Sequence, residues 1–255
     1  MHPTVDFDFF ELPLYTVLVM LGAGLGLAVA YLFLRMRSRR AASPSNFLNG
    51  ALVVFIASCI GARAYHVATH WDYYAARPDE IAQVGLGGMA MRGALITGFI
   101  ALILYARWRG LKLARLLDAT ALGLSLGQAI GWIGALVQGA NYGVVSDSPI
   151  VIDLPDVYGL IAPRFPVQYA EIILFTVLFV GLLIFASSQP KAGMLFVVYL
   201  IGTSAANFAL GFVRGDETLI INSLRIDQWV DAEMLGLALL FYLSICREGK
   251  GGMIQ

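Results

Sequence analysis

A few charged and amide side chains lie within or beside long apolar runs, where such groups are rare. Gln168 and Glu171 are three residues apart, so a helix places them on one face. Arg63 and His66 are one helical turn apart near the end of another run. Ionisable groups in an apolar phase are unfavourable, so these residues are candidates for a functional site. The full set comprises Arg63, His66, Arg92, Gln168, Glu171 and Arg214.

The arginines of this set are suited to binding phosphate. A guanidinium group matches the geometry of a phosphate through two parallel hydrogen bonds. If Arg63, Arg92 and Arg214 face Glu171, with Gln168 beside it, they form a charged cavity, and an anionic phospholipid headgroup is its natural ligand. The alternative is that each arginine stands near the end of its run and extends its charged group to the membrane interface.

The sequence does not identify the catalytic residues. His66 is a candidate base because imidazole titrates near neutral pH, and the alternative is that it only lines the cavity. Arg92 and Glu171 are weaker candidates. Further polar residues are expected to line the cavity: Gln128, Gln138, Asn141, Tyr142, Gly143, Asn207 and Gln228. We expect no metal and no cofactor, because the chain has no metal-ligand spacing, phosphate-binding glycine loop or hydrolase elbow.

The composition is that of a membrane protein. Of the 255 residues, 59% are hydrophobic and only 13% are charged, and the mean hydropathy is +0.76. A soluble domain carries about 25% charged residues. The net charge of zero gives no electrostatic case for nucleic-acid binding. Cys59 and Cys246 belong to different apolar runs, so a structural disulfide is not expected.

Seven apolar runs give the organisation of the chain. Each is near the ~20 residues that a helix needs to cross a bilayer, and isolated strands cannot do so. We therefore predict an all-α integral membrane protein whose seven transmembrane helices surround a polar cavity that faces the outer leaflet. Residues 1–255 are expected to form a single polytopic domain. The predicted spans are roughly 14–34, 47–69, 89–106, 116–139, 167–186, 192–212 and 230–246.

The distribution of charge predicts the orientation. Eleven lysines and arginines follow the odd-numbered runs: four after the first, four after the third, one after the fifth and two after the seventh. Acidic residues concentrate in the other connections. Basic loops stay in the cytoplasm, so we expect the N-terminus outside and the C-terminus inside.

Glycines spaced by four residues occur in two of the runs. Gly22 and Gly26 lie in the first, and Gly123, Gly127 and Gly131 lie in the fourth. Small residues at this spacing are typical of close helix packing in membranes, which we prefer to a functional role.

Several segments together resemble the prolipoprotein diacylglyceryl transferase family of bacteria. Their order and spacing hold from about Gly61 to Cys246. The segments are Gly61–Arg63, Arg77–Ile81, Gly87–Met89, Gly131–Gly134, Gly139–Gly143, Arg164–Glu171, Phe212–Asp216 and Gln228. The resemblance implies a multi-pass protein of the bacterial inner membrane with a cavity for phosphatidylglycerol. Family members transfer diacylglyceryl from that lipid to the lipobox cysteine of a prolipoprotein and release glycerol phosphate.

The chain departs from the family at positions that the resemblance marks as functional. The family has histidine where this chain has Arg92, and arginine and asparagine where it has Trp132 and Ala135. A further family arginine falls on Asn207, and a tyrosine falls on Ala170. Arginine cannot accept a proton, so Arg92 cannot replace a histidine base, although it can bind phosphate.

These departures leave two expectations. In the first, the chain keeps the fold and binds phosphatidylglycerol or a similar anionic phospholipid, with lost or altered catalysis and a structural or accessory role beside a membrane-protein partner. In the alternative, it is an active but divergent transferase that modifies the lipobox cysteine of a prolipoprotein. Groups that bind a substrate need not stabilise the transition state, so binding and transfer can separate.

Overall fold

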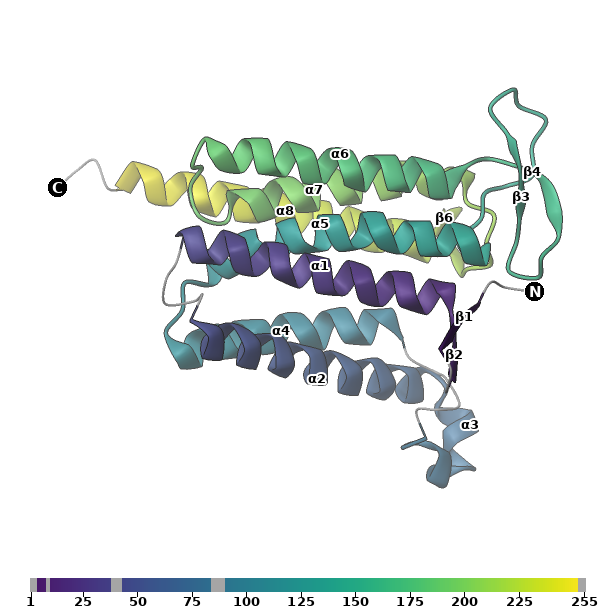
Figure 1. The fold of residues 1–255 in the computed structure, drawn as a ribbon, viewed down its shortest axis with the longest axis horizontal. Helices are drawn as coiled ribbons and strands as arrows, with labels where there is room; N and C mark the ends of the chain where they lie inside the picture. Colours follow the sequence, from purple (N-terminus) through teal and green to yellow (C-terminus); the bar gives the residue numbers. More distant parts are fainter. Residues whose placement is uncertain (1–3, 8–9, 38–42, 84–89, 252–255) are drawn as a thin grey trace. The chain divides into compact units, whose positions relative to one another are not determined.

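The computed structural model describes residues 4–7, 10–37, 43–83 and 90–251. The helices are α1 (Leu14–Arg37), α2 (Pro44–Thr69), α3 (Trp71–Ala75), α4 (Met91–Arg109), α5 (Leu113–Gln138), α6 (Val167–Ser187), α7 (Met194–Leu210) and α8 (Ile226–Gly251), with 3-10 turns at Pro78–Glu80 and Gly211–Val213. The described residues also form three antiparallel strand pairs: β1–β2 (Thr4–Phe7, Phe10–Pro13) before α1, β3–β4 (Ile152–Pro155, Ile161–Arg164) between α5 and α6, and β5–β6 (Ile220–Ile221, Leu224–Arg225) between α7 and α8 (Figure 1).

The long helices have the length and composition of membrane spans. Within the described ranges, six are apolar and long enough to cross a bilayer: α1, α2, α5, α6, α7 with its following turn, and α8 as far as Cys246. Large apolar side chains such as Phe55, Ile184 and Leu240 are about two-thirds exposed, as expected for surfaces that face lipid. The third predicted span corresponds to α4, which is not among the six. The count of seven and the outward-facing cavity therefore stay predictions.

The ends of the helices follow local signals that hydropathy alone does not contain. Helix α2 begins three residues before the prediction, because Ser43 accepts a hydrogen bond from the amide of Asn46 and Pro44 occupies the first turn. Helix α4 extends to Arg109 and ends where Gly110 adopts a left-handed conformation. Helix α8 begins four residues early, at Ile226.

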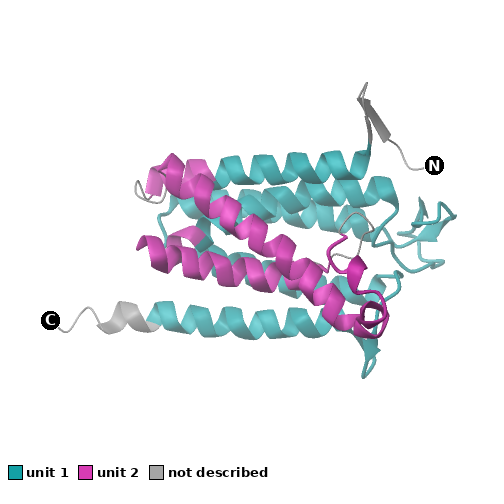
Figure 2. Ribbon diagram, turned by 90° about the horizontal axis from the view of Figure 1, so that it is seen from below, with its two compact units in different colours: residues 1–30, 117–255 teal, residues 31–116 magenta. Residues whose placement is uncertain are grey.

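The chain divides into two compact units (Figure 2). Unit 1 contains residues 1–30 and 117–255, and unit 2 contains residues 31–116. That the whole chain forms a single domain stays a prediction. Both cysteines are free in the structure, Cys59 in unit 2 and Cys246 in unit 1, and the expectation of no disulfide between them stays a prediction.

In unit 1 the glycines of α1 and α5 bring the two backbones into contact. A Cβ atom on Gly26 would lie 2.5 Å from the carbonyl oxygen of Gly123, and one on Gly22 would lie 2.8 Å from that of Gly127. Close packing through these four glycines is confirmed. The prediction is wrong for Gly131, where a Cβ atom would have no neighbour within 4 Å among the described residues.

A buried carboxylate fixes the start of α7 in unit 1. Asp118, on α5, is 1% exposed. It accepts hydrogen bonds from the backbone amides of Gly193 (2.8 Å), Leu195 (3.0 Å) and Phe196 (3.3 Å). The first amides of a helix have no partner within that helix, and the helix dipole favours a negative charge beside them. Asp118 is therefore a cap supplied by another helix, which was not predicted from the sequence.

Unit 2 is built on the pairing of α2 with α4. Thr97 donates one hydrogen bond to the carbonyl oxygen of Ala57, on the facing helix, at 2.8 Å. A Cβ atom on Gly93 would collide with the carbonyl oxygen of Gly61, so the two backbones approach as closely as glycine allows. At the other end of the pair, the Tyr105 hydroxyl donates to the carbonyl oxygen of Asn46 at 2.8 Å.

Candidate functional site

An arginine is held at the end of unit 1 where α5 ends, α6 begins, α7 ends and α8 begins (Figure 1). The Arg214 guanidinium donates to both carboxylate oxygens of Asp216, from Nε at 2.9 Å and from Nη2 at 2.7 Å. Nη2 also donates to Oδ1 of Asn141 at 2.9 Å. Nη1, which carries two N–H donors, has no hydrogen-bond partner among the described residues. The guanidinium thus has a fixed direction and donors left for a ligand.

The backbone around Arg214 explains why Asn141 lies beside it. Gly143 and Arg214 form an antiparallel bridge, and the amide of Gly215 donates to the carbonyl oxygen of Tyr142 at 2.8 Å. A Cβ atom on Gly215 would lie 2.7 Å from the carbonyl oxygen of Gly143, so only glycine fits between these strands. The Asn141–Gly143 segment and the Arg214–Asp216 segment are therefore positioned as one piece.

A second arginine shares the carboxylate of Asp216. Nη2 of Arg225 lies 3.1 Å from Oδ2 of Asp216, and Nη1 donates to the carbonyl oxygens of Asp216 (3.0 Å) and Arg214 (3.3 Å). Burial lowers the pKa of Arg214, but the hydrogen bond to Asp216 and the charges of Asp216, Asp227 and Glu171 raise it, and the net shift is upward. Arg214 and Arg225 therefore share the carboxylate of Asp216, and the charges of Asp227 and Glu171 also act on Arg214.

Glu171 and Gln168 are buried in the first turns of α6. Glu171 is 1% exposed, and the side-chain amide of Asn207 lies beside its carboxylate. When this amide is turned so that its nitrogen faces Glu171, the nitrogen donates to both carboxylate oxygens, at 3.1 and 3.3 Å. Gln168 is fully buried, and its Nε2 donates to the carbonyl oxygen of Ala140 at 3.0 Å. Its Oε1 is buried without a hydrogen-bond partner among the described residues. Gln168, Glu171, Asn207 and Arg214 thus belong to the same end of unit 1.

The other polar residues expected to line a cavity have varied environments in unit 1. Gln128 accepts a hydrogen bond from the hydroxyl of Tyr199. Gln228 accepts from the backbone amide of Arg225 and donates to the carbonyl oxygen of Phe208, which fixes the start of α8. Gln138, like Tyr142, is partly buried, and Gly143 is buried. Their role as a cavity lining stays a prediction.

Arg63 in unit 2 is engaged with backbone. Its guanidinium donates to the carbonyl oxygens of Ile81 (2.8 Å), Glu80 (2.6 Å) and Gln83 (3.3 Å). It also lies over the ring of Tyr74, 5.2 Å from the centroid. In the structure Arg63 therefore ties the segment after α3 to helix α2.

The remaining candidates of unit 2 are His66 and Arg92. His66 is partly exposed and stacks on His70, with ring centroids 4.3 Å apart. Arg92 lies in the first turn of α4, and its side chain is outside the described part of the structure. Because these residues and Arg63 belong to the other unit, their convergence with Arg214 and Glu171 stays a prediction.

The ion pairs that hold the loops of unit 1 were not predicted from the sequence. Asp216 was named only as the end of a segment that resembles the family, and neither Asp156 nor Arg225 was named. Arg164 donates to Asp156 at 2.9 Å, and both side chains are more than nine-tenths buried. Asp156 also accepts from the amides of Tyr158 and Leu160. An aspartate shortly before Gly159 is a turn signal that could have identified this pair of interactions.

Comparison with known proteins agrees with the resemblance. A family model described as "Prolipoprotein diacylglyceryl transferase" matches residues 4–244. The phosphatidylglycerol–prolipoprotein diacylglyceryl transferase of Synechococcus elongatus is 33% identical over 213 residues, which cover 79% of this chain and 73% of that protein. The proteins of the same name from Corynebacterium efficiens (32% over 231 residues; 83% and 71%) and Bacillus licheniformis (32% over 229 residues; 85% and 82%) are similar.

The chain therefore belongs to the prolipoprotein diacylglyceryl transferase family, as the sequence motifs predicted. The family and the apolar helices together indicate a multi-pass membrane protein of a bacterial inner membrane. The orientation of the two termini stays a prediction.

Proposed function

We propose that this chain transfers the diacylglyceryl group of phosphatidylglycerol to the cysteine thiol of a prolipoprotein. The observation that carries the proposal is Arg214, which Asp216 and Asn141 hold in place while Nη1 keeps donors for a phosphate. The names of the relatives supply the two substrates. This is the alternative of the two expectations from the sequence.

The reaction needs a nucleophile, a leaving group and a proton acceptor. The thiolate sulfur attacks the glycerol carbon that carries the phosphate ester. A carbon–sulfur bond forms, the carbon–oxygen bond to phosphate breaks, and glycerol phosphate leaves with the electron pair. The thiol proton passes to a base before or during the attack, because the thiol itself is a weak nucleophile.

Arg214 acts on the leaving group in this scheme. Negative charge grows on the phosphate as the carbon–oxygen bond breaks, and a fixed cation stabilises that charge more than it stabilises the bound lipid. Asp216 and Asn141 are positioning residues, since they touch Arg214. Glu171, fixed by Asn207, adds a negative charge whose field acts on Arg214.

The proton acceptor must be a residue other than arginine. Arg92 stands where the family has histidine, and its guanidinium cannot take a proton. His66 and Glu171 are the candidates, one in each unit. Loss of a positioned base lowers a rate by about 10²–10⁴-fold. Separate His66→Gln and Glu171→Gln variants, assayed for transfer, distinguish the two.

The experiment that tests the proposal is replacement of a transferase in cells. A bacterial strain depleted of its own enzyme is complemented with this chain, and expression in the membrane is verified. Mass spectrometry of a reporter lipoprotein then measures the diacylglyceryl adduct on its cysteine. Growth with the adduct supports transfer. Absence of the adduct, with the chain present in the membrane, overturns the proposal.

A second candidate function is a lipid-binding relative without transfer activity. The observation that favours it is the replacement of family histidine, arginine and asparagine by Arg92, Trp132 and Ala135. Such a protein would still bind phosphatidylglycerol through Arg214. Lipid that co-purifies with the chain, together with failed complementation, would select this function. None of the comparisons supports the membrane-protein partner that this alternative envisages.

A further inference from the structure

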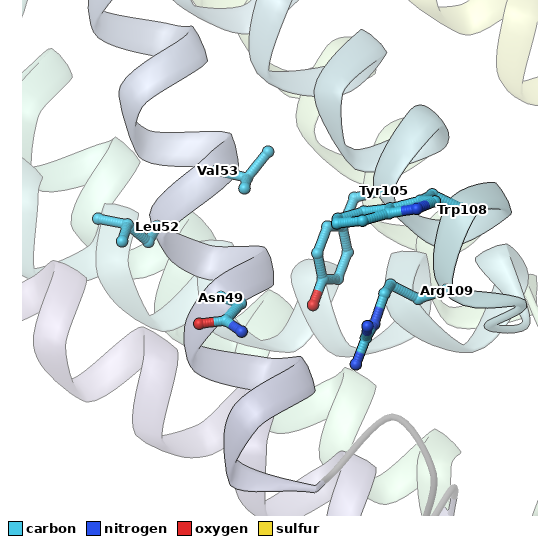
Figure 3. A pocket seen from close by; sticks show the side chains of 6 residues that line it. All are labelled: Asn49, Leu52, Val53, Tyr105, Trp108 and Arg109. Carbon is cyan, nitrogen blue, oxygen red and sulfur yellow. The ribbon is translucent and has the colours of Figure 1, made fainter.

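A pocket lies in unit 2 between the first turns of α2 and the last turns of α4. Its volume is about 230 Å³. It is lined by Asn49, Leu52, Val53, Tyr105, Trp108 and Arg109 (Figure 3). Arg63 and His66, the candidates on α2, lie at the opposite end of that helix. The pocket is therefore separate from Arg63 and His66.

The polar end of the pocket carries a positive charge. The Arg109 guanidinium donates to Oδ1 of Asn46 from Nε, at 2.9 Å, and from Nη2. This amide oxygen fixes the direction of the guanidinium, and because it is neutral it does not cancel the charge. Neither α2 nor α4 contains an aspartate or glutamate. The Arg109 guanidinium is thus the charged group that lines this pocket.

The other walls of the pocket are apolar. Leu52 is 56% exposed and Val53 is 40% exposed. Trp108 is 77% exposed at the end of α4, where an amphipathic ring is typical of the membrane interface. Pockets that hold drug-sized ligands have about 300–1,000 Å³, so this smaller volume fits a headgroup and the first methylene groups of a chain.

We propose that this pocket binds an anionic phospholipid of the leaflet on the side of the basic loops. The lipid phosphate contacts Arg109, the Trp108 ring lies at headgroup level, and the start of an acyl chain runs along Leu52 and Val53. The occupant is a bilayer lipid because Leu52 and Val53, the apolar wall, belong to α2, which has the length and composition of a membrane span. Arg107, Lys112 and Arg115 raise the concentration of anionic lipid nearby. The site takes no part in the transfer reaction.

Quenching of Trp108 fluorescence by brominated lipids tests this site in the full chain. The chain has four tryptophans, and replacement of the other three by phenylalanine leaves Trp108 as the only emitter. The protein is placed in phosphatidylcholine nanodiscs that contain brominated phosphatidylglycerol or, for comparison, brominated phosphatidylcholine. The buffer holds about 1 M NaCl, where the screening length is only about 3 Å and diffuse attraction is suppressed.

We expect phosphatidylglycerol to quench Trp108 at a mole fraction about tenfold lower than phosphatidylcholine, the factor for one charge-assisted hydrogen bond. Arg109→Gln should remove this preference. Arg107→Gln, which removes the same charge two residues away and outside the pocket lining, should retain it. Equal quenching by the two lipids, or the same loss in both variants, overturns the site.

A variant that keeps the charge distinguishes the loss of the phosphate contact from a loss of folding. Arg109→Lys retains a cation at the same place, so it should keep most of the preference if the charge binds phosphate. Circular dichroism confirms that each variant is helical. The diacylglyceryl adduct is measured on the same variants, and because this pocket is not part of the transfer site, Arg109→Gln should leave that adduct unchanged. Failure of the lipid site and failure of the proposed function are therefore separate results.

Discussion

Arg214→Gln is the substitution that tests the candidate phosphate site most directly. Arg214 makes three hydrogen bonds in the structure, two to Asp216 and one to Asn141. Glutamine is uncharged and shorter, so it removes the cation and both Nη1 donors. The substitution should therefore weaken binding of phosphatidylglycerol much more than it weakens the fold.

The contacts of Arg214 determine how much stability and how much affinity for phosphatidylglycerol the substitution should remove. Removal of one partner of a buried ion pair costs about 3–5 kcal/mol when the other charge is left alone. Asp216 would keep Arg225 at 3.1 Å and is 20% exposed, so we expect a destabilisation of about 1–2 kcal/mol. A hydrogen bond to a charged group contributes about 1.5–3 kcal/mol, so the affinity for phosphatidylglycerol should fall by about 10–150-fold.

Equilibrium binding of a fluorescent phosphatidylglycerol to the chain in neutral detergent measures the loss. Thermal unfolding, followed by circular dichroism, measures stability on the same samples. Arg164→Gln is the matched control, because it breaks another buried arginine–aspartate pair of unit 1 without removing Arg214. An affinity within about twofold of the unmodified chain in a folded Arg214→Gln protein would refute the assignment, as would an equal loss in the control.

Three further outcomes are expected. Asp118→Asn removes the charge that caps α7, so it should lower the stability measured by thermal unfolding by about 1–2 kcal/mol and leave the affinity for lipid intact. Unchanged stability would contradict the cap. Gly26→Ala should destabilise by about 1–3 kcal/mol through overpacking, while Gly131→Ala, with open space around it, should not; equal effects contradict the glycine contact. In a variant without native cysteines, Ser146→Cys should react with an impermeant maleimide on intact cells and Ser188→Cys only after lysis; the reverse pattern inverts the orientation.

The membrane spans could be predicted because hydropathy is a property of a whole segment. A run of apolar residues must be helical in a bilayer whatever its neighbours are. The ends were less predictable, since they depend on individual hydrogen bonds such as the one that Ser43 accepts. Helix α8 begins early because the side chain of Gln228 reaches back to the amide of Arg225, a local interaction that a hydropathy window averages away.

The candidate site was predictable in its residue types and less so in its contacts. An arginine in an apolar chain indicates a function or a snorkelling side chain, and the sequence does not say which. The Arg63 guanidinium donates to three backbone carbonyl oxygens in a loop about twenty residues later in the chain. Residue spacing does not predict these contacts. Asp118 was missed for the same reason, because its partners lie about 75 residues later in the chain.

The structure bears on whether the departures from the family abolish lipid binding. Trp132 and Ala135 replace a family arginine and asparagine, and Ala135 is 4% exposed within α5. A cation and an amide nevertheless lie together at the end of the same unit. Arg214 supplies the cation and Asn141 supplies the amide, and both residues lie outside the spans. In the proposed function, Arg214 and Asn141 therefore supply a cation and an amide to the phosphate, although position 132 holds a tryptophan.

Transfer also requires a proton acceptor, which a phosphate-binding arginine cannot supply. The thiol must lose a proton, and of the groups discussed only an imidazole or a carboxylate can accept it near neutral pH. A cation that binds the headgroup contributes to affinity in the ground state, whereas the base acts only on the way to the transition state. The two candidate functions therefore predict the same affinity for phosphatidylglycerol and differ only in turnover. Affinity and adduct formation must be measured on one preparation, because either value alone is compatible with both.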